Sequence, residues 1–413
     1  MTISNDELRG ILLAALSPRA REAAVALARL DADDRRKWLS LARQHRLLPQ
    51  LHAHLAQIWP PEARELAEVA ARAYKNAALR ALRMQRELVQ ANRVLVAAGV
   101  PGIALKGSDL AFHVYAHPAL RPLRDLDVLV PREQILTAWQ ALLDAGWQRE
   151  PGFQGDPKIC AEISKHLPPL CSATGEVHLE LHVQLHEPDP DPDPTHAGKV
   201  DEAGVWARSV TRLVAGETLR YLSPTDLLLH LVVHAVYDHH FNNGPLTLLD
   251  VHQLMARDAI DWPLFWRLAD EGGWRQGCLL LLCMVESHFG TPVALPLHDS
   301  GMRAELEGLA HDSLRLMLGE LSARGDVALL GALASMRWPE KIRFLYSRAF
   351  PARKAVSAFF HPGDTPWGAC KGYLKKYTRM TAQRLPGFFR RGRTSALRSD
   401  LHRYARLEYW LRH

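Results

Sequence analysis

The chain has 413 residues, of which 47% are hydrophobic and 23% charged, and its formal net charge is +6. These proportions are typical of an ordinary globular protein, exclude a disordered chain and leave room for two or three modest domains. No apolar run approaches the roughly 20 residues that a membrane-spanning helix needs, so we expect no transmembrane segment.

Two further features favour a cytoplasmic protein. The first residues, Met-Thr-Ile-Ser-Asn-Asp-Glu, lack both a basic start and an apolar core, so we expect no secretory signal. The cysteines are odd in number and include no Cys-x-x-Cys pair, which favours reduced thiols over a disulfide framework.

Residues 1–99 are expected to be helical throughout. After a Pro-Pro pair, residues 62–98 form an Ala-rich stretch, and its apolar side chains recur at helical spacing: Met84, Leu88, Ala91 and Leu95. Gly99 follows at the position where helices commonly end. We therefore predict one long helix here, within a helical platform that packs against a sheet formed by the residues that follow.

Residues 103–130 have the pattern of a strand, a loop, a short helix and a second strand. The loop carries Lys106-Gly107-Ser108, whose backbone N–H groups and hydroxyl at a helix start suit phosphate oxygens. The second strand carries Asp125 and Asp127, which share one face because strand side chains alternate. Isolated Asp-x-Asp pairs are often solvated, but beside a phosphate-binding loop this pair predicts a Mg²⁺ or Mn²⁺ site for phosphoryl or nucleotidyl transfer.

Residues 131–146 predict an amphipathic helix, which gives the strand–helix–strand–helix order of an α/β unit around a small mixed sheet. The clearest strand follows at residues 176–185, and its alternation places His178, Glu180 and His182 on one face. Because two metal ions need a shared carboxylate and further ligands, we expect Glu180 to be the third acid. We expect the two histidines to contact the metal-binding acids or the substrate; structural roles and a zinc site are the alternatives.

These motifs resemble the nucleotidyltransferase superfamily related to DNA polymerase beta. More narrowly, they are similar to a bacterial, largely uncharacterised nucleotidyltransferase family with the pattern K-G, R-x-x-x-D-x-D-x-L-V and E-x-H. The resemblance covers about residues 90–260 and is carried by Lys106-Gly107-Ser108, Tyr115, Arg121 to Val130, Gly146-Trp147 and Glu180-x-His182.

The resemblance implies an α+β fold with a polymerase-beta-like core between helical flanks. It also implies that Asp125, Asp127 and Glu180 hold two Mg²⁺ (or Mn²⁺) ions. By the same resemblance, the Lys106-Gly107-Ser108 loop would hold the β and γ phosphates of an NTP. Arg121 and Arg124 are candidates to neutralise developing charge, or are packed under the loop.

A helix that starts at Ser223-Pro224 carries His230 and His234 at i, i+4 spacing. Its sequence, His-Leu-Val-Val-His, lacks the Glu of the metalloprotease motif, which excludes that class. The resembling family also has a His-rich helix, followed by an L-x-x-L-D-like element that ends here at Asp250. This implies that His230, His234 and Asp250 line the acceptor side of the cleft; a buried network of His bonded to Asp250 is the alternative.

The C-terminal residues 341–413 are strongly basic, with 17 Lys and Arg against 3 Asp and Glu, whereas residues 1–340 have 34 against 42. Aromatic residues are interleaved with these cations. Such an arm suits a polyanion, an anionic membrane surface or an acidic partner, and it could equally fold back on the acidic body.

We therefore predict four regions: a helical region 1–99, a catalytic core 100–220, a helical substrate-side domain 221–340 and a basic arm 341–413. The expected function is Mg²⁺-dependent transfer of a nucleoside monophosphate from an NTP, ATP being the expected one, to a hydroxyl of a small molecule, peptide or protein. The alternatives are a degenerate nucleotide-binding regulatory module and a nucleic-acid-binding protein that uses the arm.

Overall fold

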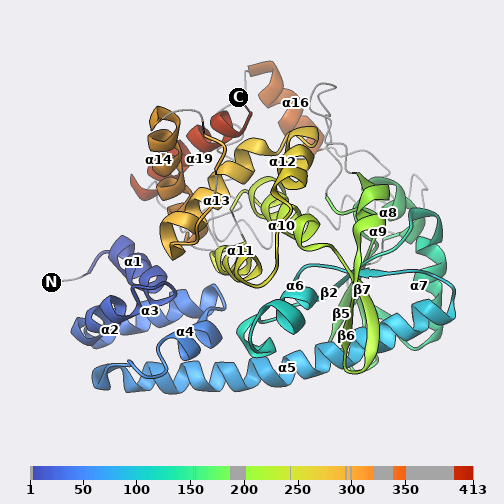
Figure 1. Ribbon diagram of the computed structural model, residues 1–413, viewed down its shortest axis with the longest axis horizontal. Coiled ribbons are helices and arrows are strands. Elements are labelled where there is room, and N and C mark those ends of the chain that lie inside the picture. Colours follow the sequence, from blue (N-terminus) through green and yellow to red (C-terminus); the bar gives the residue numbers. More distant parts are fainter. Residues whose placement is uncertain are drawn as a thin grey trace. The chain divides into compact units, whose positions relative to one another are not determined.

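One mixed sheet of seven short strands lies in the part of the chain that the structure describes (Figure 1). In this computed structural model the described residues are 3–151, 153, 155–186, 201–241, 243–293, 295–297, 300–319, 338–349 and 395–412. The mixed sheet, together with the helices that precede and follow it in the sequence, confirms the predicted α+β fold. None of the described helices is long and apolar enough to span a membrane.

The strand order is β3-β4-β5-β2-β1-β7-β6. Strand β2 runs parallel to β5, and β1 parallel to β7, whereas the other neighbours are antiparallel. The strands are β1 (Ile103–Ala104), β2 (Leu126–Leu129), β3 (Gln148–Arg149), β4 (Leu170–Cys171), β5 (His178–His182), β6 (Val210–Val214) and β7 (Glu217–Tyr221).

The chain folds into two compact units, each built from segments that are distant in the sequence. The first unit consists of residues 1–85, 106–123 and 223–321, and the second of residues 86–105, 124–222 and 322–413. The sheet lies wholly within the second unit. The loop at residues 106–108, which sequence analysis assigned to the catalytic core, belongs to the first unit.

The described elements of the first unit are helical. Apart from the first part of the long helix described below, they are α1 (Asn5–Ala15), α2 (Ala20–Arg29), α3 (Ala32–Gln44), α4 (Leu48–His54), the 3-10 helix η1 (Pro61–Ala63), α6 (Gly107–Asp109), the π-helix η2 (Leu110–Val114), the 3-10 helix η3 (Pro118–Leu120), α10 (Pro224–Val233), the π-helix η5 (His234–Asp238), α11 (Leu246–Arg257), α12 (Trp262–Glu271), α13 (Arg275–Phe289) and α14 (Ser300–Met317). Helix α13 is buried continuously from Gly277 to Val285 and contacts α10, α11, α12 and α14. A helix that is apolar all round in this way forms the centre of a helical core.

The long helix predicted for residues 62–98 is confirmed as α5 (Arg64–Ala97), which ends before Gly99 at a positive φ of 71°. Its first part belongs to the first unit and its last part to the second. The other described helices of the second unit are the 3-10 helix η4 (Arg132–Gln134), α7 (Ile135–Asp144), α8 (Pro157–Ile163), α9 (Glu202–Arg208), α16 (Trp338–Ala349) and α19 (Ser395–Arg412), of which α7 contacts β5.

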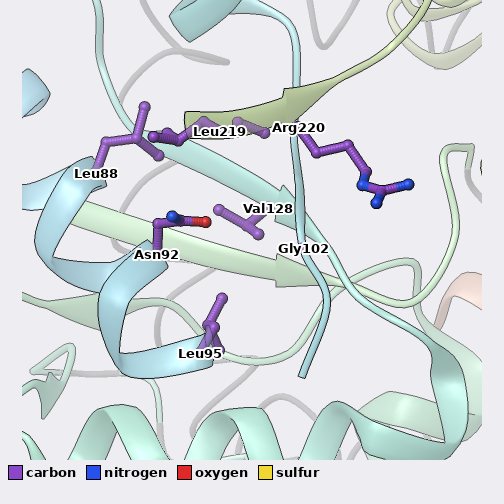
Figure 2. A pocket seen from close by; sticks show the side chains of 8 residues that line it. Leu88, Asn92, Leu95, Gly102, Val128, Leu219 and Arg220 are labelled. Carbon is purple, nitrogen blue, oxygen red and sulfur yellow. The ribbon is translucent and has the colours of Figure 1, made fainter. Parts of the chain in front are cut away.

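The last turns of α5 cover one face of the sheet. Figure 2 shows Leu88 and Leu95 of the helix beside Val128 and Leu219 of the strands, around a small, mostly apolar recess. A Cβ atom at Gly102 would lie 3.0 Å from Cγ1 of Val128, so glycine permits the chain to pass this close to β2. Because neighbouring strand residues point to opposite faces, Asp127 points away from α5.

We predict that Leu88→Ala lowers the free energy of unfolding by about 2–5 kcal/mol, because Leu88 is only 1% exposed in this packing. The matched control in the same helix is Leu82→Ala, whose side chain is 63% exposed and whose loss should change stability by no more than about 0.5 kcal/mol. Urea unfolding followed by circular dichroism measures both. Equal effects of the two substitutions would contradict the packing of α5 on the sheet.

Candidate active site

The carboxylates of Asp127 and Glu180 lie side by side on the sheet face that α5 does not cover. The parallel pairing of β2 with β5 puts Asp127 opposite Glu180. The fully buried ring of His182 completes the group: its Nε2 lies 2.9 Å from Oδ1 of Asp127 and 3.7 Å from Oε2 of Glu180. One donor atom from each of the three residues lies within 4.8 Å of the others.

The local sequence explains why these side chains meet. In both strands the alternate positions are leucine or valine, and Leu126, Val128, Leu179 and Leu181 are all buried. Burying this apolar face fixes the register, since a slip of one residue would expose the leucines and bury the acids against α5. The backbone N–H of Leu105 also donates to the carbonyl of Asp127 at 2.9 Å, which ties β2 to the chain that leaves β1.

Two imidazoles offset the repulsion between the acids. Burial favours the neutral form of Glu180, but the hydrogen bond from the adjacent His182 ring and the nearby His166 outweigh it, so the pKa of Glu180 is lowered. The Nε2 atom of His166 lies 3.7 Å from Oε2 of Glu180. Glu180 is therefore held as a carboxylate, which is the form that binds a cation.

Two carboxylate oxygens and one imidazole nitrogen form a donor set that fits a divalent cation. Asp125 does not belong to this group of three: it is half-buried and lies just before β2, which begins at Leu126. Of the predicted acids, the structure thus brings together Asp127 and Glu180, and it adds His182 as a direct neighbour of both. His178 lies at the start of the same strand, beside Glu150 and Cys171.

The predicted phosphate loop has an unusual backbone. Lys106 has φ 42° and ψ −108°, a conformation that costs energy in a residue other than glycine and tends to persist at functional sites. A Cβ atom at Gly107 would lie 2.8 Å from Cδ2 of Leu123, so the loop approaches that side chain closely. Ser108 is buried at the start of the short helix α6, which continues as the π-helix η2.

The sequence profile of a family described as an uncharacterised nucleotidyltransferase matches residues 31–290, more than half of the chain. The chain belongs to this family. No curated protein and no solved structure matches it. Family membership confirms the resemblance found in the sequence and supports nucleotidyl transfer as the general activity.

Arg121 and Asp250 form an ion pair inside the first unit. Nε of Arg121 donates to Oδ1 of Asp250 at 2.7 Å, and the hydroxyl of Tyr115 donates to the same oxygen at 2.9 Å. Burial raises the pKa of Asp250, and the guanidinium of Arg121 opposes that rise. Arg121 is thus paired with a buried acid, whereas Arg124 is exposed.

We predict that Asp250→Asn lowers the free energy of unfolding by about 3–5 kcal/mol, because it leaves the charge of Arg121 buried without its counter-ion. Tyr115→Phe should cost about 1 kcal/mol, the loss of one hydrogen bond. Glu271→Gln is the control, because its pair with Arg267 is exposed and should contribute less than about 1 kcal/mol. Urea unfolding of the three variants measures the differences; equal losses for Asp250→Asn and Glu271→Gln would contradict this assignment.

The predicted histidine pair lies at the junction of α10 and η5. Ser223 caps α10 as predicted, by accepting from the N–H of Asp226. The rings of His230 and His234 stack with centroids 6.0 Å apart, and His239 lies against His234 at 4.3 Å. Burial, together with the positive charge of Lys106, lowers the pKa of His234 to about 3, although Asp238 acts in the opposite direction. His234 is therefore neutral at pH 7.

Acidification should destabilise the protein through His234. The folded pKa of about 3 lies below the ordinary value of 6.5, so the unfolded state takes up a proton first as the pH falls. Between pH 7 and pH 5 this should lower the free energy of unfolding by about 2 kcal/mol. We expect His234→Gln to lose that much less stability than the wild type over this interval, and the exposed-site control His311→Gln to behave like the wild type. Urea unfolding at pH 7 and pH 5 measures these changes. Equal decreases in the free energy of unfolding of the wild type and His234→Gln would show that His234 does not cause the pH dependence.

The structure also brings in a residue that sequence analysis missed. His166 reaches Glu180 from the connection between α8 and β4, through an isolated bridge between His166 and His182. Residues 150–170 are rich in glycine, proline and polar side chains and have no strand periodicity, so no pattern marked His166. The basic arm is described only at residues 341–349 and 395–412, and its other residues lie outside the described part.

Proposed function

We propose that the protein is a divalent-metal-dependent nucleotidyltransferase that transfers a nucleoside monophosphate from an NTP, ATP being the expected one, to an acceptor hydroxyl. The observation that carries the proposal is the Asp127–Glu180–His182 group, in a chain whose family is one of nucleotidyltransferases. The acceptor class is that of the sequence prediction: a small molecule, a peptide or a protein.

Asp127 and Glu180 would hold the metal through their carboxylate oxygens. A divalent cation bound there supplies charge that stabilises the phosphate oxygens and lowers the pKa of the acceptor hydroxyl. The His182 ring, fixed at 2.9 Å from Asp127, orients that carboxylate and keeps the repulsion between the two acids low in the absence of metal. Asp125, two residues before Asp127, remains our proposed further ligand.

The proposed metal is Mg²⁺ or Mn²⁺. Two carboxylates suit both ions, and an imidazole as third donor shifts the preference towards Mn²⁺, because Mg²⁺ takes oxygen donors. If His182 remains hydrogen-bonded to Asp127 when metal binds, the ligands are oxygens alone, and the site suits Mg²⁺ as well as Mn²⁺. Replacing His182 therefore tests the metal preference as well as the activity.

Lys106, Gly107 and Ser108 are proposed to bind the NTP phosphates. The close passage of Gly107 past Leu123 and the strained backbone of Lys106 support a loop shaped for a ligand. Arg124 is the proposed cation for developing charge, since Arg121 is committed to Asp250. His230 and His234 are proposed to line the acceptor side, where His234, neutral because its pKa is about 3, would contact the acceptor through hydrogen bonds and would not take up its proton.

The proposal predicts that Asp127→Asn and Glu180→Gln each lower NTP turnover by about 100-fold or more, because each removes a metal-binding charge. Both should also weaken Mn²⁺ binding, measured without nucleotide by electron paramagnetic resonance. Glu176→Gln, an exposed acid two residues before β5, is the control and should change neither quantity. Unchanged Mn²⁺ affinity in both variants would exclude this group as the metal site.

Turnover with cell extract and binding of nucleic acid, measured on the same variants, separate the alternatives. A degenerate regulatory module would bind Mn²⁺ and NTP through these residues but show no turnover with any extract as a source of acceptor. A nucleic-acid-binding protein that uses the basic arm would bind RNA or DNA in a salt-sensitive way, and that binding would survive Asp127→Asn.

A further inference from the structure

A second group of metal-binding side chains lies at the edge of the sheet, outside the proposed active site. It consists of Cys171 on β4, His178 on β5 and Glu150 directly after β3. The Nδ1 atom of His178 lies 3.4 Å from Sγ of Cys171 and 3.3 Å from Oε2 of Glu150. One donor atom from each residue lies within 4.8 Å of the others.

Strand pairing explains this convergence. Cys171 is the direct partner of His178 across β4 and β5, and Gln148 is the partner of Cys171 across β3 and β4. Glu150 follows Gln148 by two residues, so the alternation of side chains puts Glu150 on the same face as Cys171 and His178. Strands β4 and β5 and the residue that follows β3 therefore each contribute one donor to a single point.

The contacts do not fit a catalytic Cys-His-Glu triad. In a triad the acid binds one ring nitrogen and the nucleophile the other, so that a proton can pass through the ring. Here both the thiol and the carboxylate lie against the same nitrogen, Nδ1. In addition, burial and the charge of Glu150 raise the pKa of Cys171, which keeps it a thiol rather than a nucleophilic thiolate while no cation is present.

We propose that Cys171, His178 and Glu150 bind a divalent metal ion of the borderline type, Zn²⁺ in the first place. Sulfur, nitrogen and oxygen donors at about 2.0–2.3 Å from a tetrahedral zinc lie about 3.3–3.8 Å from one another, and the two short separations seen here match that range. The thiol and imidazole select against Mg²⁺. Three protein donors leave a fourth position for water or another ligand.

Such an ion would fasten the edge of the sheet. Strands β3 and β4 have only two residues each, so their few backbone hydrogen bonds hold the edge weakly. A metal ion bound by these three residues would hold β3, β4 and β5 in register. Its ligand His178 lies on β5 two residues before Glu180, so the ion would also stabilise the strand that carries Glu180. The site shares no residue with the Asp127 group, and the inference does not rest on the proposed function.

Titration of the full-length protein with Co²⁺ tests this inference, because a thiolate bound to Co²⁺ gives a near-ultraviolet charge-transfer band that oxygen and nitrogen donors do not give. We expect the band in the wild type and its bleaching by Zn²⁺. It should be lost in Cys171→Ser and in His178→Ala. Cys160→Ser, which removes a buried thiol from α8 in the same unit, and Asp127→Asn, which alters the other group, should retain it.

Far-ultraviolet circular dichroism of each variant shows whether it is folded. A folded wild type without the band at saturating Co²⁺ would overturn the proposal. So would a band that persists in Cys171→Ser or in His178→Ala, because the thiolate would then belong to another cysteine or to a site without the imidazole. Loss of Mn²⁺ binding in Asp127→Asn with an intact cobalt band would leave this site standing, whatever happens to the proposed function.

Discussion

The parallel pairing of β2 with β5 is the interaction on which the proposed activity depends. It places Asp127 directly opposite Glu180, although the two residues are far apart in the sequence. The pairing is stabilised by the apolar face of the same strands, where Leu126, Val128, Leu179 and Leu181 are buried. Packing of the apolar face of β2 and β5 therefore brings the carboxyl groups of Asp127 and Glu180 together on the other face. Their mutual repulsion would destabilise the fold unless other groups offset it.

Histidine side chains offset that repulsion. His182 lies between the two carboxylates, and His166 reaches Glu180 from a connection outside the strands. Their effect is visible in the lowered pKa of Glu180, which burial alone would raise. The geometry therefore keeps Glu180 available as a carboxylate beside Asp127, which is the form that a divalent cation would bind.

Sequence periodicity predicted the elements of this site better than their contacts. Alternation in residues 176–185 identified Glu180 and His182 on one face, and Asp-x-Asp identified Asp127, because both signals are local. The contacts of His166 and Cys171 depend on which strands become neighbours, which no local pattern contains.

The β6–β7 hairpin was also missed: its turn, Ala215-Gly216, has positive φ at both residues but lacks the Asn-Gly or Asp-Gly signal of such turns. Likewise, an arginine that binds phosphate and one that pairs with a buried acid look alike in sequence, and only the structure shows Arg121 on Asp250.

The most direct test of nucleotidyl transfer uses two labelled forms of the same NTP, one at the α and one at the γ phosphate. The full-length protein would be incubated with each form, a divalent metal and a cell extract, and the labelled products separated. Nucleotidyl transfer attaches label from the α phosphate to an acceptor, while label from the γ phosphate leaves as pyrophosphate. Transfer of the γ label to an acceptor would contradict it, since that result is phosphoryl transfer by a kinase.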